Sequence, residues 1–183
     1  MPQRSVCAEI GVDKGEFSQK IIDRVQPTKL HTIDPWKYEE GETYQRSRYG
    51  GKRGENQVNM DRRYEAVVER FRSQIESDRV IIHRGYSHEV CSEFQSNYFD
   101  WIYIDGNHLY EFVKQDLELY YRTVKEGGLI TGDDYRDGGW WQGGVKKAVD
   151  EFVAKGFVEA IEIKGGQFIL KKKSMDNSQG SAK

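Results

Sequence analysis

The stretch that decides the fold is residues 98–135, YFDWIYIDGNHLYEFVKQDLELYYRTVKEGGLITGDDY. An apolar run at 99–104 predicts a buried strand and stops abruptly at the polar loop Asp105–His108. A second apolar run, 129–131, stops at Asp133-Asp134. Because a helix is predicted between them, the two strands are expected to be parallel neighbours with both acidic ends at one edge of a sheet. Ligands of open α/β sheets bind at that edge, so we expect a functional site there.

Strand and helix patterns alternate along the whole chain. Short apolar runs predict strands, and apolar residues at helical spacing predict the helices between them. A closing hairpin adds an antiparallel strand. The alternation favours an α/β fold, a doubly wound, Rossmann-like and mostly parallel sheet with helices on both faces. The predicted strands are 6–10, 30–33, 80–82, 99–104, 129–131, 157–163 and 167–171, and the predicted helices are 17–25, 61–75, 113–124 and 145–153.

Local signals place the ends of two predicted helices. Asp61 is a plausible N-cap for the helix over 61–75, and Gly127-Gly128 reads as the stop of the helix over 113–124. Residues 1–172 are predicted to be one domain, and residues 173–183 a disordered tail.

The composition narrows the class of protein. The 183 residues are 32% charged and 37% hydrophobic with a net charge of −2, which is typical of a globular domain and gives no support for a nucleic-acid partner. No run approaches the about 18 apolar residues of a membrane span, and the N-terminus lacks the apolar core of a secretory signal. Cys7 and Cys91 form neither a metal spacing nor a disulfide framework, so we expect a cytoplasmic protein.

A glycine-containing loop, residues 9–15, joins the first strand to the first helix. Gly11 and Gly15 allow a tight turn and close approach to a ligand. A dinucleotide fingerprint needs a third glycine where Asp13 stands, and Glu9 lies just before. Two carboxylates would repel a pyrophosphate but attract the ammonium and sulfonium groups of S-adenosylmethionine (SAM), so SAM is the predicted cofactor and NAD is the weakest choice.

Asp34, at the end of the second strand, is predicted to accept hydrogen bonds from the cofactor ribose. The alternative for Asp34 is a turn cap before Pro35, and for Glu9 it is a salt bridge at a strand end. Gly85, Tyr86 and Ser87 follow the third strand and are candidates for the adenine edge. The predicted cofactor residues are Glu9, Gly11, Asp13, Gly15, Phe17, Ser18, Asp34, Gly85, Tyr86, Ser87 and Asp105.

These motifs resemble those of the class I SAM-dependent methyltransferases over about residues 5–172. The chain looks most similar to small bacterial and phage-type domains whose fourth strand ends in Asp-Gly-x-His and whose fifth ends in Asp-Asp-Tyr. The resemblance implies methyl transfer from SAM and a seven-stranded sheet with the last strand antiparallel. Metal-dependent O-methyltransferases of the catechol and macrolide-sugar types carry a similar pattern, matched here by Asp105, His108, Asp133 and Asp134.

Three converging carboxylates repel one another unless a cation or shared protons intervene. We therefore expect Asp105, Asp133 and Asp134 to bind Mg²⁺ or a similar divalent cation, which prefers oxygen ligands. The predicted catalytic residues are His108, as general base toward an acceptor hydroxyl, and Asp105. The alternatives are that Asp105 and Asp133 only cap helices and that His108 faces solvent at a helix start.

Two further segments are candidates for the rim of the site. Residues 36–60 are rich in tyrosine, arginine and glycine, and read either as a lid over the substrate or as a solvated loop. Trp140-Trp141, in a glycine-rich loop, could stack on a sugar or pack a homodimer contact.

The leading hypothesis is an O-methyltransferase for a small hydroxylated acceptor, such as a sugar or glycan precursor. The alternatives are a metal-independent methyltransferase with nitrogen or carboxyl acceptors, and a SAM-binding subunit without catalysis.

Overall fold

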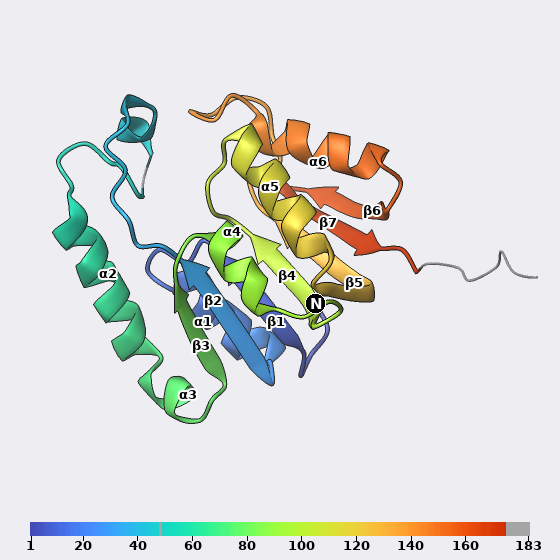
Figure 1. Ribbon diagram of the computed structural model, residues 1–183, viewed down its shortest axis with the longest axis horizontal. Coiled ribbons are helices and arrows are strands. Elements are labelled where there is room, and N and C mark those ends of the chain that lie inside the picture. The colour runs from blue at the N-terminus through green and yellow to red at the C-terminus, as the bar shows by residue number, and fades with distance from the viewer. Residues whose placement is uncertain (48, 175–183) are drawn as a thin grey trace, which may run out of the picture.

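The protein is built around one seven-stranded sheet (Figure 1). This is a computed structural model, which describes residues 1–47 and 49–174; most of the predicted tail, 175–183, lies outside the described residues. The strand order is β3-β2-β1-β4-β5-β7-β6. The strands are β1 (Val6–Ile10), β2 (Lys29–Asp34), β3 (Val80–Arg84), β4 (Phe99–Ile104), β5 (Val124–Gly132), β6 (Val158–Lys164) and β7 (Gln167–Lys172). β7 runs antiparallel to both of its neighbours, which confirms the predicted doubly wound α/β fold with an antiparallel last strand.

Helices cover both faces of the sheet (Figure 1). One apolar core forms against α4 (Ser87–Val90), α5 (Tyr110–Tyr121) and α6 (Gly144–Ala154), and the other against α1 (Glu16–Val25) and α2 (Gln57–Arg70). The shorter helices are α3 (Arg72–Glu76) and the 3₁₀ turns η1 (Glu42–Arg46) and η2 (Cys91–Glu93). Within the described residues, no helix is long and apolar enough to cross a membrane.

Two predicted helix ends were wrong. α2 begins at Gln57 rather than after Asp61, because the Asn56 side chain accepts a hydrogen bond from the Val58 N–H and caps the helix. α5 already ends at Tyr121, and Gly127 and Gly128 lie within β5 instead of stopping the helix. A Cβ at Gly128 would come within 2.8 Å of the Asp100 carbonyl oxygen, so this glycine is needed where β5 passes close to β4.

A close contact between two strand ends positions the loops of the site. The Asp105 N–H, just after β4, donates to the carbonyl of Ile10, the last residue of β1, at 2.8 Å. Gly11 follows with a φ of 89°, and a Cβ there would lie 2.1 Å from the Asp105 carbonyl oxygen. Only glycine therefore lets the loop after β1 pack against the loop after β4.

A chain of polar contacts runs from Tyr98 through the buried His31 of β2 and His83 of β3 to the exposed Glu93. His31 Nδ1 lies 2.9 Å from His83 Nε2, His31 Nε2 lies 3.1 Å from the Tyr98 hydroxyl, and His83 Nδ1 lies 2.9 Å from Glu93. One set of neutral tautomers satisfies every link, from the tyrosine O–H through both imidazoles to the carboxylate. Burial and, to a smaller extent, the neighbouring His83 together lower the pKa of His31 to about 4.

Gly11→Ala should destabilise the fold by at least about 3 kcal/mol, because it adds a backbone clash to the strain of a left-handed residue. Gly54→Ala is the matched control, since Gly54 has a φ of 87° and nothing within 4 Å of its Cβ position. It should cost only about 1 kcal/mol. Urea unfolding measures both, and equal losses would contradict the close contact.

Acidification should destabilise the protein through His31. Its folded pKa lies below the ordinary value of 6.5, so the unfolded chain binds the extra proton as the pH falls. The free energy of unfolding should therefore fall by about 3 kcal/mol as the pH is lowered from 6.5 to 4. His31→Gln should flatten this slope in urea titrations at several pH values, whereas His88→Gln, at an exposed position, should leave it unchanged. An unaltered slope in His31→Gln would refute this origin of the acid sensitivity.

Candidate active site at the carboxyl edge of the sheet

The predicted site residues follow strands that end side by side. In the parallel pairings Ile10 is the partner of both Ile33 and Ile104, and Ile104 is the partner of Gly132. The loops after β1, β2, β4 and β5 therefore emerge at one edge, as the acidic strand ends predicted.

Three side chains form a compact polar cluster at this edge: Asp105, His108 and Asp134. His108 Nε2 lies 3.2 Å from Asp105 Oδ1, and His108 Nδ1 lies 3.2 Å from Asp134 Oδ2. One ligand atom from each residue falls within 4.8 Å of the others, which is the only such group of three among the described residues. We call these three residues the acidic cluster.

Asp133 lies outside the acidic cluster. Its carboxylate accepts the Asp134 N–H at 2.8 Å, and Asp134 itself takes a left-handed backbone with a φ of 58°. One oxygen of Asp133 is thus engaged by the backbone of its neighbour. The structure therefore groups Asp105 and Asp134 of the predicted triad with His108 and leaves Asp133 outside this group, and the metal-binding roles of these residues remain predictions.

His108 is enclosed between the two carboxylates. Its Nδ1 is buried and, despite its 3.2 Å distance from Asp134, has no partner in hydrogen-bond geometry. A neutral imidazole carries one N–H, so one ring nitrogen must face a carboxylate without a proton between them. A proton or a metal ion would relieve that repulsion.

Charge and burial shape the rest of the acidic cluster. Burial raises the pKa of Asp105 above its usual value, while the hydrogen bond from His108 opposes the shift. Arg136 pairs with the second oxygen of Asp134 at 2.6 Å. The rings of Trp140 and Trp141 lie 6.1 and 5.1 Å from the His108 ring and form an aromatic wall.

The carboxylates of the glycine loop are already satisfied within the protein. Asp13 forms an ion pair with Arg63 of α2, which also binds Glu55 at 2.8 Å. Glu9 is buried and accepts the Ser18 hydroxyl, and burial raises the pKa of Glu9 to about 8. These residues therefore offer a cationic ligand far less free negative charge than the sequence suggested. Ser18 is fully buried beneath the loop.

Asp34 is fully engaged as a hydrogen-bond acceptor. Its Oδ2 accepts from the N–H groups of Val12 (2.8 Å) and Asp13 (3.1 Å), and its Oδ1 accepts from the Trp36 N–H (2.7 Å) and from the Tyr49 hydroxyl. Burial raises the pKa of Asp34, and these four hydrogen bonds oppose the shift. The turn cap before Pro35 is observed directly, because Asp34 Oδ1 accepts the Trp36 N–H, and the ribose role of Asp34 remains a prediction.

The remaining predicted cofactor residues line the same edge with different roles. Ser87 donates to Asp116 of α5, and the Tyr86 hydroxyl donates to Glu39 at 2.8 Å. The Phe17 ring stacks on Tyr103 with centroids 4.1 Å apart. Gly15 packs against the Phe71 ring, where a Cβ would come within 2.8 Å. The cofactor roles of all of these residues remain predictions.

The described parts of the 36–60 segment, residues 36–47 and 49–60, contact this edge. Tyr44 accepts a hydrogen bond from Asn107 at 2.9 Å, and its ring lies 5.9 Å from that of Trp140. Glu39 and Tyr49 add the contacts to Tyr86 and Asp34. The tyrosine-rich composition pointed to this segment, whereas nothing local in the sequence indicated that Arg63, 50 residues from Asp13, would reach the glycine loop.

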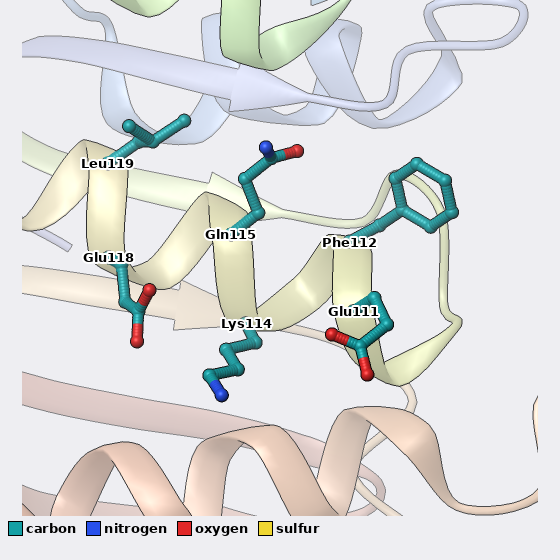
Figure 2. Close-up of a pocket in the computed structure, with 6 residues that line it drawn as sticks. All are labelled: Glu111, Phe112, Lys114, Gln115, Glu118 and Leu119. Atoms are coloured by element: carbon teal, nitrogen blue, oxygen red, sulfur yellow. The ribbon is translucent and has the colours of Figure 1, made fainter.

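A shallow hollow on α5 lies apart from these residues (Figure 2). Figure 2 shows Phe112, Gln115 and Leu119 on one side of the helix and Glu111, Lys114 and Glu118 on the other. All six belong to a single helix, and none is a predicted site residue.

Comparison with known proteins agrees with this architecture. A family model described as "Methyltransferase domain" matches residues 8–135. An uncharacterized protein, R132, of Acanthamoeba polyphaga mimivirus is 45% identical over 58 residues, 32% of this chain and only 26% of the viral protein.

Two solved structures share the fold. Cofactor-bound Rv0187 from MTB has a TM-score of 0.65 at 15% identity, and a protein from Klebsiella pneumoniae described as an O-methyltransferase has 0.64 at 16%. Each alignment covers 92% of this chain and 73% of the other. The family match spans the glycine loop, Asp34 and the acidic cluster, and the chain belongs to the methyltransferase domain family as a class I SAM-dependent methyltransferase.

Proposed function

We propose that this enzyme methylates a hydroxyl oxygen of a small acceptor, such as a sugar or glycan precursor, beside a divalent cation held by the acidic cluster. The observation that carries the proposal is the position of His108 between two carboxylates, with a buried, unpartnered Nδ1.

The donor atoms suit a metal ion. Two carboxylates and one imidazole within 4.8 Å form a mixed oxygen and nitrogen set. Mg²⁺ prefers oxygen ligands, whereas Mn²⁺ accepts both oxygen and nitrogen, so Mn²⁺ suits the cluster whether or not the imidazole coordinates it. When bound, such an ion would lower the pKa of an acceptor hydroxyl.

The residues of the edge have separate tasks in the proposed reaction. His108 can take the hydroxyl proton only at a ring nitrogen that neither carries a proton nor binds the ion, so in this role Asp105 and Asp134 hold the ion and His108 acts as the base. The acceptor oxygen then forms a bond to the methyl carbon of SAM as the carbon–sulfur bond breaks, and S-adenosylhomocysteine leaves. The Trp140 ring lies beside His108 and the Tyr44 ring lies beside Trp140, and aromatic rings of this kind suit the carbon skeleton of a sugar or another small molecule.

Asp134→Asn should weaken Mn²⁺ binding at least about tenfold, because it removes a charged ligand. Asp133→Asn is the matched control, since its oxygen can still accept the Asp134 N–H, and its Mn²⁺ affinity should change less than about twofold. Electron paramagnetic resonance of Mn²⁺ reports binding without any acceptor. Equal affinities in the two variants would exclude the acidic cluster as the metal site.

Methyl transfer from labelled SAM to a panel of hydroxylated acceptors should fall on addition of EDTA and recover with Mn²⁺ or Mg²⁺. Transfer that ignores EDTA and metal would favour a metal-independent methyltransferase. Tight SAM binding without transfer to oxygen, nitrogen or carboxyl acceptors would favour a non-catalytic subunit.

A further inference from the structure

Asp34 has no acceptor position left for a ribose hydroxyl. An ionised carboxylate offers about four lone-pair positions, and Asp34 receives four hydrogen bonds. Its exposed fraction is 1%. A ribose hydroxyl can therefore bind Asp34 only if one of the present donors leaves.

Three of the four donors are fixed by the fold. The N–H groups of Val12 and Asp13 belong to the loop that packs against Asp105, and Trp36 follows β2 directly and is fully buried. Trp36 is also tied to the glycine loop, because its Nε1 donates to the Asp13 carbonyl at 2.9 Å. Moving any of these groups would disturb the loop itself.

The fourth donor, Tyr49, is different in kind. It is a side chain from the segment that contacts the edge, and a rotation of that side chain withdraws its hydroxyl without moving the strands. Its ring also lies near Arg63, whose guanidinium is 5.4 Å from the ring centroid. Arg63 stays in place through its ion pairs with Asp13 and Glu55.

We propose that the Tyr49 hydroxyl is a displaceable stand-in for a ribose hydroxyl of the cofactor. Cofactor binding exchanges one hydroxyl–carboxylate hydrogen bond for another, and Tyr49 sets the affinity by competing for Asp34. This inference rests on the proposed placement of the SAM ribose at Asp34. In this inference Tyr49 opposes cofactor binding, so removing the Tyr49 hydroxyl should strengthen cofactor binding.

Tyr49→Phe should bind S-adenosylhomocysteine about five- to tenfold more tightly than the wild type, because no hydrogen bond has to be broken. Isothermal titration calorimetry on the full chain measures the affinity. Tyr38→Phe is the matched control: it removes a hydroxyl from the same segment, one without a hydrogen bond among the described residues, and should change the affinity less than twofold. Thermal unfolding verifies that both variants fold.

A second measurement follows the hydroxyl directly. With ¹³Cζ-labelled tyrosine, the NMR signal assigned to Tyr49 through its loss in Tyr49→Phe should shift when S-adenosylhomocysteine binds the wild type, as the hydroxyl leaves the carboxylate. The signal of Tyr38 should shift much less.

The outcomes separate this inference from the proposed function. Binding to Tyr49→Phe that is unchanged or weaker, or a Tyr49 signal that does not move, overturns the displacement while leaving a SAM site intact. If the folded wild type and both variants all fail to bind S-adenosylhomocysteine, the placement of SAM falls and the inference falls with it.

Discussion

The contact between Gly11 and the backbone of Asp105 is the constraint on which the site depends. β1 and β4 end in register, and the Asp105 N–H bonds to Ile10 while Gly11 passes so close that a Cβ would lie 2.1 Å from the Asp105 carbonyl oxygen. The glycine loop and the acidic cluster are thereby held against each other. With the cofactor on the glycine loop, as proposed, this contact would place the methyl donor next to the residues proposed to handle the acceptor.

The carboxylates of the glycine loop are engaged by other side chains of the protein. Sequence reasoning took Glu9 and Asp13 as free negative charges that select SAM, and the family confirms SAM, but the structure does not support that reason. Asp13 is neutralised by Arg63, and Glu9 is buried against Ser18 with a raised pKa. The acidic cluster is the exception, because His108 cannot satisfy both of its carboxylate neighbours with one proton.

The features that depend on local sequence pattern could be predicted from the sequence. Apolar periodicity gave the order of strands and helices, and parallel topology then placed Asp105 and the Asp133-Asp134 pair at one edge. Features set by distant contacts were missed. Gly128 resembles a helix stop locally but is required by the Asp100 backbone of the next strand. Of the two adjacent aspartates it is Asp134 that contacts His108, and Asp134 has a left-handed backbone that no spacing rule indicates.

The account's central claim is that a cation at the acidic cluster lies beside the methyl group carried on the glycine loop. Paramagnetic relaxation of ¹³C-methyl-labelled SAM by Mn²⁺ tests this most directly, with both bound to the wild-type protein. The account predicts strong broadening of the methyl signal that persists in Asp133→Asn and disappears in Asp134→Asn. A methyl signal that stays sharp while both ligands are demonstrably bound would contradict it.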